Sequence, residues 1–239
     1  MVCLLFPSPC RLCHRPLRHA RRLPVCAACL AEIQPLSAPG CRQCGKNWRQ
    51  AEDSADGRCL SCLANPPAYS GAVCATVYQG AARELIQLLK FGGVTTAAEF
   101  WATRLAERIG QLPEAPECIV PVPLGRRRQR QRGFNQSGEI ARRLARKLDC
   151  AYLQGGLQRR RETAPQSGLD LAHREKNLHR AFAGHARRLA GRSVLLVDDV
   201  LTTGATARAA AEALRRAGAG RIMLAVAARA DLRLEEEAA

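Results

Sequence analysis

The feature of this sequence that most constrains its fold is a set of eight cysteines, which form four C-x-x-C pairs within the first 62 residues. Two thiolates separated by two residues can bind one metal ion from a tight turn, and two such turns complete a tetrahedral site. Eight ligands therefore predict two closed zinc sites with no open coordination position for catalysis. We expect this zinc to be structural, because the first 65 residues have few large apolar side chains and cannot fold on burial alone. The expected ligands are Cys10, Cys13, Cys26, Cys29, Cys41, Cys44, Cys59 and Cys62.

Some properties of this cysteine block stay open in the sequence. The pairs could share a metal serially, first with second and third with fourth, or in an interleaved order. An iron–sulfur cluster is an alternative to zinc, whereas four disulfides would need an oxidising compartment. His14 or His19 could replace a cysteine ligand, although eight thiols make this unnecessary. The other cysteines are interpreted as ordinary thiols, the last three of them buried: Cys3, Cys74, Cys118 and Cys150.

The charge of the chain is strongly positive and unevenly distributed. Lysine and arginine number 37 against 21 aspartate and glutamate, a net charge of +16, and residues 120–192 hold eighteen basic and five acidic side chains. Such a surplus indicates polyanionic partners, either nucleic acid or phosphorylated small molecules, and we expect them to bind at this basic stretch. Since aromatic residues make up only 4% of the chain, phosphate contacts would dominate any nucleic-acid binding and make it steeply salt-dependent.

The sequence favours a cytoplasmic protein without membrane insertion. No apolar run approaches the roughly 20 residues that a membrane helix needs. The first ten residues, MVCLLFPSPC, lack the basic and long apolar regions of a signal peptide.

The chain is expected to divide near residue 66. The cysteine pairs end at Cys62, and Asn65-Pro66-Pro67 then breaks regular structure. We therefore predict a double zinc ribbon over residues 1–65 and an α/β domain over residues 66–239.

Strand-like and helix-like segments alternate beyond that boundary. The predicted strands are Val73–Tyr78, Cys118–Val122, Ser193–Val197 and Ile222–Ala227, and the predicted helices are Ala81–Phe91, Thr96–Ile109, Gln136–Leu148 and Thr206–Arg216. In the second helix we expect Phe100, Trp101, Leu105 and Ile109 to face inward. This alternation predicts a parallel sheet with right-handed crossovers, whose ligands lie beyond the carboxyl ends of the strands.

The run from Asp198 to Thr206, which follows the third predicted strand, is the most specific motif. Small and hydroxyl residues ahead of a helix offer consecutive backbone N–H groups and the positive helix end, which together bind phosphate. Asp198 and Asp199 would repel phosphate, so they suit sugar hydroxyls and a Mg²⁺ ion carried by the ligand. No lysine follows Gly204, which excludes the G-x-x-x-x-G-K-[ST] nucleotide loop. The alternative is an aspartate N-cap with a threonine-rich first turn.

The run V-D-D-V-L-T-T-G-A-T, Val197 to Thr206, resembles the phosphoribosyl pyrophosphate (PRPP) motif of type I phosphoribosyltransferases. With the four C-x-x-C pairs, the whole chain resembles the ComF family, double-zinc-ribbon proteins related to competence and DNA uptake. Further matching segments are Leu88-Leu89-Lys90-Phe91, Val120-Pro121-Val122-Pro123-Leu124, Arg132-Gly133-Phe134-Asn135-Gln136, Thr163, Gln166, Arg174, Asn177-Leu178 and Ala181-Phe182.

The resemblance implies a parallel-sheet type I phosphoribosyltransferase fold with an N-terminal zinc-ribbon module, and PRPP with Mg²⁺ as its ligand. Asp198 and Asp199 would hold the ribose hydroxyls, and the 5-phosphate would lie on Thr202, Thr203, Gly204, Ala205 and Thr206. Val200, between these two groups, is also expected to bind the ligand.

The arginine-rich segment after the second predicted strand would act on the pyrophosphate. This group leaves from the anomeric carbon, and its charge needs stabilisation, for which Arg128 and Arg132 are the candidates. Asn135 and Gln136 would orient the ligand. The run Arg159–Arg161, followed by Thr163 and Gln166, looks like the mobile hood loop of the wider superfamily.

Three functions remain open at this point. The first is transfer of ribose 5-phosphate from PRPP to an unknown acceptor. The second is a nucleic-acid module, with single-stranded DNA favoured, that works in DNA uptake with the uptake machinery as partner. The third is a transcription regulator that senses PRPP. We favour PRPP binding with a role in DNA uptake or processing, a role that comes from the resemblance.

Overall fold

The computed structural model describes residues 8–17, 19, 21–36, 40–47, 56–161 and 180–230. The helices are α2 (Ala27–Ala31), α3 (Leu60–Ala64), α4 (Gly80–Phe91), α5 (Ala97–Ile109), α6 (Arg126–Arg132), α7 (Gln136–Lys147), α9 (Ala186–Leu189) and α10 (Ala205–Arg216). The strands are β1 (Gly71–Val77), β2 (Cys118–Pro121), β3 (Ala151–Tyr152), β4 (Leu157–Arg159), β5 (Phe182–Gly184), β6 (Val194–Leu201) and β7 (Ile222–Arg229).

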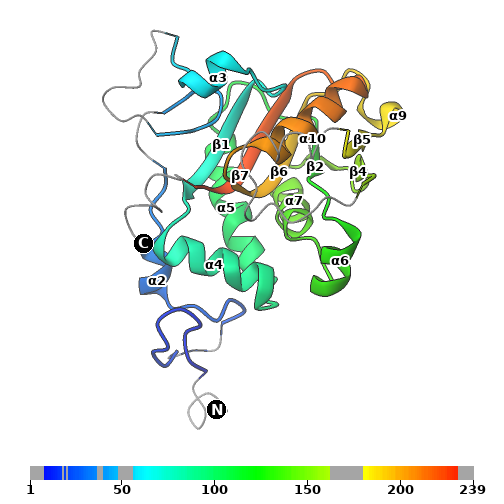
Figure 1. Cartoon of the computed structure of the whole chain (residues 1–239). Coiled ribbons are helices and arrows are strands. Elements are labelled where there is room, and N and C mark those ends of the chain that lie inside the picture. Colours follow the sequence, from blue (N-terminus) through cyan, green and yellow to red (C-terminus); the bar gives the residue numbers. More distant parts are fainter. Residues whose placement is uncertain are drawn as a thin grey trace.

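A five-stranded sheet forms the centre of the molecule (Figure 1). Its order is β1-β7-β6-β2-β3, and every pairing is parallel. A separate antiparallel pair joins β4 and β5. The predicted parallel α/β architecture is confirmed. Since parallel strands end at one edge, the segments that follow β2 and β6 meet there.

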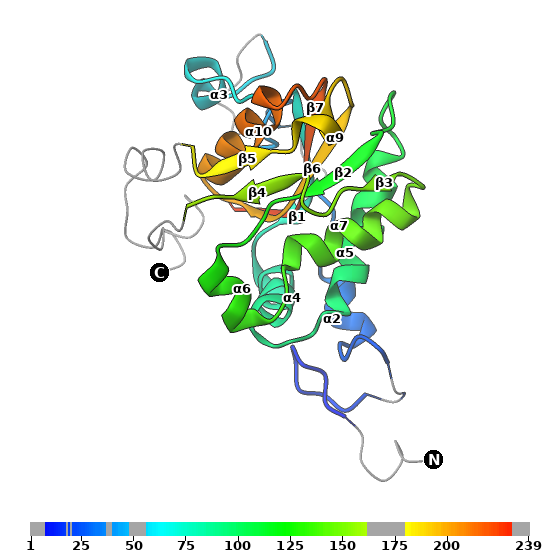
Figure 2. The same ribbon diagram turned by 90° about the vertical axis from the view of Figure 1, so that its right-hand side faces the viewer.

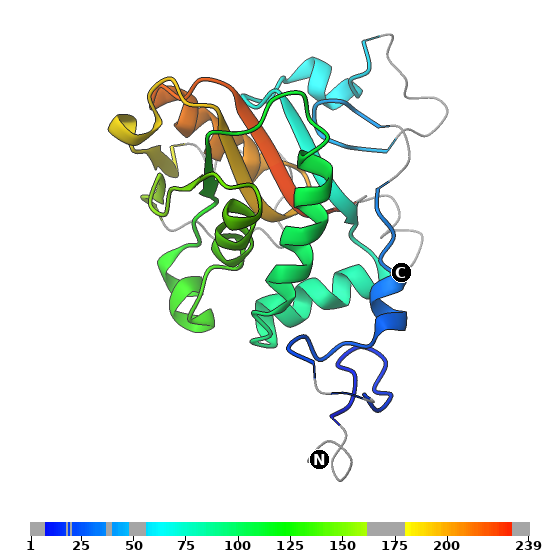
Figure 3. The ribbon, with the colours of Figure 1, turned by 180° about the vertical axis from the view of Figure 1, so that it is seen from behind.

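Helices cover both faces of this sheet. Helices α4, α5 and α7 pack on one face, and α10 packs on the other (Figures 2 and 3). Trp101, Leu105 and Ile109 are buried as predicted. Phe100 is half-buried and packs against the same core, so the prediction that it faces inward holds only in part. The adjacent Trp101 occupies the inner face of α5 and turns the ring of Phe100 to its flank, with the two rings edge to face at 5.0 Å.

Two segments differ from their predicted structure. Strand β6 does not end at Val197 but continues to Leu201, because Asp198 and Val200 stay in register with Val226 and Ala228 of β7. The arginine-rich segment, for which no element was predicted, forms α6, and Gly133 ends it with a φ of +77° that glycine tolerates at no cost.

The cysteine-rich segment lies along one edge of the sheet. Figure 1 shows α2 beside α4, whereas α3 lies at the opposite end of β1. Between them, Leu36 N donates to Ala75 O at 3.0 Å, and Thr76 Oγ1 donates to Gln34 O at 2.5 Å. The division near residue 66 stays a prediction.

Two smaller expectations concern thiols and membranes. Cys74 and Cys118 are buried as predicted, Cys150 is only half-buried where the chain leaves α7 for β3, and Cys3 lies outside the described residues. Within the described part of the chain, no helix combines the length and apolar character needed to cross a bilayer.

Candidate functional site

The paired cysteines gather into two groups whose thiols lie within 4.8 Å of one another. Cluster 1 consists of Cys10, Cys13, Cys26 and Cys29, and cluster 2 of Cys41, Cys44, Cys59 and Cys62, so the pairing is serial. A tetrahedral zinc ion with bonds of about 2.3 Å places its sulfurs about 3.8 Å apart. Cys13 and Cys26 Sγ are 3.7 Å apart, as are Cys44 and Cys59 Sγ. Both clusters fit zinc, and neither contains a histidine among the described residues.

Backbone N–H groups stabilise the thiolates of both clusters. Cys26 N donates to Cys10 Sγ at 3.3 Å, and Cys59 N donates to Cys41 Sγ at the same distance. Burial raises the pKa of Cys10, but N–H groups of Cys13 and Cys26 outweigh it and bring the pKa down to about 6. Burial and hydrogen bonds within the cluster raise the pKa of Cys29, so without a metal the four thiols divide between thiolate and thiol forms.

The turn between β6 and α10 presents a helix N-terminus at the carboxyl edge of the sheet. Gly204 is the N-cap with a φ of +85°, a conformation that disfavours any side chain, and it offers no side-chain cap to the helix. The neighbouring Thr203 contributes instead: its Oγ1 accepts a long hydrogen bond of 3.4 Å from Ala205 N, the first residue of α10. The positive end of the helix dipole at this turn favours an anion. The alternative of an aspartate N-cap is wrong, because both aspartates lie within β6.

The two carboxylates of the motif have different environments. Asp198 Oδ1 accepts hydrogen bonds from Ser137 Oγ and Asp199 N, both at 2.9 Å. Asp199 Oδ2 lies 3.1 Å from Lys90 Nζ, and the two side chains are 9% and 17% exposed. Burial, followed by the negative charge of Asp199, raises the pKa of Asp198 to about 7. Asp199 is thus paired with Lys90, whereas the pKa of Asp198 lies near 7.

One of the two predicted pyrophosphate ligands, Arg132, interacts electrostatically with Asp199. Arg132 stacks on the Phe91 ring with its guanidinium carbon 4.6 Å from the centroid. Burial lowers the pKa of Arg132, and the nearby charge of Asp199 opposes this shift. Arg128 is exposed on α6 and acts on Arg132 as a like charge.

Asn135 and Gln136 lie at the start of α7, and the Asn135 side chain connects it to the residue that follows β2. Asn135 Oδ1 accepts from Ser137 N at 3.1 Å, and its Nδ2 donates to Val122 O at 3.0 Å. Gln136 is 4% exposed, and within the described residues its Oε1 accepts no hydrogen bond. A cavity of about 650 Å³ lies beside this junction, with Asn135 and Arg126 among its lining residues.

The sequence did not identify three residues that shape this site. Lys90 pairs with Asp199, Ser137 donates to Asp198, and Arg229 Nη1 donates to Leu201 O at 3.0 Å and also to Thr202 O. These contacts join residues far apart in the chain. Of the three, only Lys90 belongs to a segment that carries the family resemblance, Leu88-Leu89-Lys90-Phe91. Ser137 lies within the predicted helix Gln136–Leu148, which gave no sign of its contact with Asp198.

The predicted hood loop lies largely beyond the described residues. Arg159 belongs to β4, with its guanidinium carbon 5.5 Å from the Phe182 ring centroid, and Arg160 N donates to Ala181 O at 2.8 Å. Thr163, Gln166, Arg174, Asn177 and Leu178 lie outside the described residues.

The Lys90–Asp199 pair yields a stability prediction. Lys90→Met leaves a mostly buried carboxylate without its cation, so we expect it to lower the free energy of unfolding by about 3 kcal/mol. The double variant Lys90→Met/Asp199→Asn should recover most of that loss, because it removes both charges. Urea unfolding of the three proteins measures this; equal stability of Lys90→Met and wild type would show that the pair contributes nothing.

The fold and the two cysteine clusters define an α/β protein with a phosphoribosyltransferase-type domain and a double zinc ribbon. The "Phosphoribosyl transferase domain" family matches residues 131–238, and the "Double zinc ribbon domain" family matches residues 1–63.

Curated relatives specify the family. The chain is 33% identical to Competence protein F of Haemophilus influenzae, over 86% of this chain and 90% of the relative. It is also 33% identical to the DNA utilization protein YhgH of Escherichia coli K12, over 92% and 96% respectively. The chain belongs to the ComF family.

Among solved structures, the Bacillus subtilis glutamine PRPP amidotransferase matches with a TM-score of 0.40 and 21% identity, over 56% of this chain. This chain covers only 26% of the amidotransferase chain.

Proposed function

We propose that this ComF-family protein binds Mg²⁺ and PRPP at the β6–α10 turn and acts in DNA uptake or DNA processing. The observation that carries the proposal is the placement of a helix N-terminus with a glycine N-cap directly after two carboxylates at the carboxyl edge of a parallel sheet. The helix N-terminus suits a phosphate, and the two carboxylates suit ribose hydroxyls and a divalent cation.

The surrounding residues fit both ends of such a ligand. Arg132 lies near Asp199, where a guanidinium can neutralise a pyrophosphate. Gln136 Oε1 is a buried acceptor without a hydrogen-bond donor among the described residues, as expected of a group that meets a ligand hydroxyl. When bound, Mg²⁺ would offset the pyrophosphate charge.

The DNA role rests on the relatives, one named for competence and one for DNA utilization. We further propose that single-stranded DNA is the nucleic-acid partner and that the protein works in the cytoplasm. The net charge of +16 supports a polyanionic partner of this kind.

Thermal shifts with a ligand series test the proposed site. PRPP with Mg²⁺ should raise the melting temperature most, ribose 5-phosphate and pyrophosphate should each raise it less, and ribose should leave it unchanged, because the site binds both charged ends. Equal shifts with ribose and PRPP would contradict the assignment. A parallel assay of pyrophosphate release with candidate acceptors distinguishes a transferase from a binding protein.

The pKa of Asp198 predicts how PRPP affinity depends on pH. Its native value of about 7 is raised above the ordinary carboxyl range, so the unliganded protein holds this proton up to neutral pH. Mg²⁺ and ribose hydroxyls favour the carboxylate, so binding must release the proton below pH 7. We expect affinity to fall about fivefold to tenfold from pH 8 to pH 6, with proton release visible in calorimetry across buffers of different ionisation enthalpy. Affinity that is independent of pH over this range would contradict a ligand role for Asp198.

A further inference from the structure

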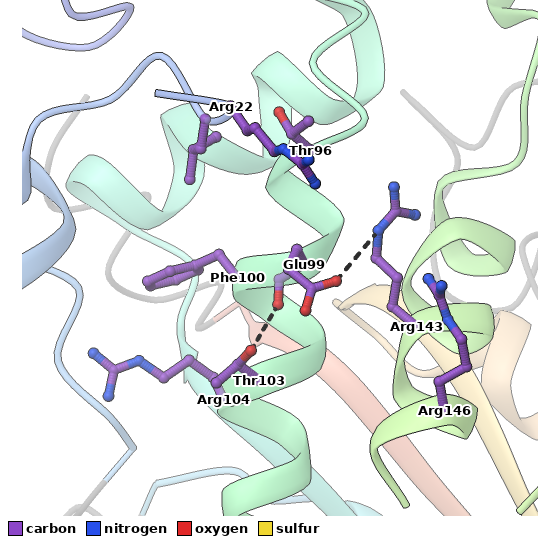
Figure 4. Close-up of a pocket in the computed structure, with 9 residues that line it drawn as sticks. Arg22, Thr96, Glu99, Phe100, Thr103, Arg104, Arg143 and Arg146 are labelled. Atoms are coloured by element: carbon purple, nitrogen blue, oxygen red, sulfur yellow. Dashed lines mark hydrogen bonds and ion pairs between the residues drawn. The ribbon is translucent and has the colours of Figure 1, made fainter. Parts of the chain in front are cut away.

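A second basic cavity lies away from the β6–α10 turn, between the zinc ribbon and the helical face of the sheet. Its volume is about 780 Å³. Arg22 and Leu23, from the loop between the two halves of cluster 1, form one wall, and α5 and α7 form the others. Figure 4 shows Arg22 beside Thr96. Phe100 and Arg104 project from one side of α5, and Arg143 and Arg146 lie across from its other side, on α7. None of the residues that line it belongs to the proposed PRPP site.

The charge in this cavity is positive, and two of its four lining arginines are compensated: Arg104 lies 3.9 Å from Glu107, and Arg143 pairs with Glu99 and Glu139. Glu99 is the only acid among its lining residues, and Lys147 Nζ at 2.7 Å and Arg143 Nε at 3.6 Å already neutralise it. Among the described residues, neither Arg22 nor Arg146 has a carboxylate within 4.0 Å, and both are exposed. Two cations therefore lie at the rim with their charge available to an anion.

The cavity also offers an aromatic surface. Phe100 is half-buried, and the guanidinium of Arg104 lies 5.4 Å from its ring centroid. A phenyl ring covered by a guanidinium is a planar cationic stack on which an unpaired base can lie. The apolar side chain of Leu23 extends this surface from the opposite wall.

This combination favours single-stranded nucleic acid over other polyanions. An acidic peptide would use the arginines but has no need of an aromatic stack. A duplex keeps its bases within its own stack, so only an unpaired base could reach Phe100. The volume also falls in the range of about 300–1,000 Å³ typical of small-ligand pockets, which suits one or a few nucleotides.

We infer that this cavity binds single-stranded DNA, with a base against Phe100 and Arg104 and phosphates on Arg22 and Arg146. The inference rests on the proposed DNA role, and it places the DNA at a site separate from the PRPP turn. Because cluster 1 holds the loop that carries Arg22 and Leu23, zinc would complete the DNA site as well as stabilise the ribbon.

Fluorescence anisotropy with a labelled twenty-nucleotide oligothymidylate tests the site on the zinc-loaded protein. Phe100→Leu keeps the apolar packing but loses the stack, so affinity should fall about tenfold, whereas Phe100→Trp should retain it. Arg22→Ala and Arg146→Ala should each reduce the slope of log affinity against log salt by about 0.7, the value for one lost phosphate contact on a single strand. The matched control is Arg187→Ala, an exposed arginine on α9, whose affinity should stay within twofold of wild type.

The outcomes separate this inference from the proposed function. If wild type binds the oligonucleotide and Phe100→Leu binds equally well, the cavity is not the DNA site, although the DNA role stands. Equal losses of oligonucleotide affinity in Arg22→Ala and Arg187→Ala would show that the DNA is attracted by diffuse charge, and would also contradict the assignment of this cavity. If wild type does not bind the oligonucleotide at low salt, both the inference and the DNA role fail, while PRPP titration of the same protein still reports on the turn.

Discussion

Replacing Asp198 and Asp199 together by asparagine is expected to weaken PRPP binding at least about 100-fold. Each carboxylate would accept charge-assisted hydrogen bonds from ribose hydroxyls or interact with Mg²⁺, and two such losses of about 1.5–3 kcal/mol each give this factor. The amides keep the shape of the side chains, so the loss reflects charge. Calorimetric titration of wild type and variant with PRPP in excess Mg²⁺ measures it.

The Lys90–Asp199 pair complicates this experiment, since Asp199→Asn leaves Lys90 without its partner. The single variant Asp198→Asn keeps that pair intact and should still lose about tenfold in affinity. Glu114→Gln, a neutralised carboxylate whose side chain is 68% exposed, is the charge-matched control and should bind like wild type. Wild-type affinity in a folded double variant would remove the dyad from the site.

Chelation is expected to remove the two metals in order, cluster 1 before cluster 2. Cys13 is exposed and Cys26 half-buried, whereas the four thiols of cluster 2 are at most 7% exposed, so a chelator reaches the first metal more readily. Because metal binding supplies folding free energy, loss of the second metal should lower the melting temperature by more than about 10 °C. A colorimetric chelator should report two phases of one zinc each, and hydrogen exchange should locate the first opening in residues 8–36.

Cys74→Ala is the matched control for the second phase. Cys74 is a buried thiol close to cluster 2, because a methyl group placed on Gly45, the residue after Cys44, would lie 2.7 Å from Cys74 Sγ. Cys74 nevertheless belongs to neither cluster. This variant should keep two zinc ions per chain, whereas Cys59→Ala should hold only one firmly. Simultaneous release of both metals, or a fully stable protein after chelation, would contradict two separate structural sites.

The sequence predicted those features that depend on local pattern. The C-x-x-C spacing indicates that the two thiols within each turn bind the same metal, and the alternation of apolar strands with amphipathic helices specifies a parallel sheet. Serial pairing of the cysteine turns was not predictable, because it depends on the path of the chain past α2 and along β1. The extension of β6 through Asp198 was also missed, since its register with β7 is a long-range property.

In the candidate site, too, the sequence identified residues that are contiguous in the chain and missed those that come from distant elements. The glycine N-cap and the two acids are contiguous in sequence and could be identified there. Lys90 and Ser137 reach the acids from separate helices, and no local pattern connects them. Phe100 was assigned to the core from helical periodicity and packs there only in part, because the adjacent Trp101 takes the fully buried position.

The most direct test of PRPP binding at the β6–α10 turn is a calorimetric titration of PRPP into the zinc-loaded protein, with and without Mg²⁺. We expect one site per chain, with affinity at least about tenfold weaker when Mg²⁺ is absent, because the carboxylates and the pyrophosphate then repel each other. Absence of binding under both conditions would contradict the proposal and leave the turn as a structural element of the fold.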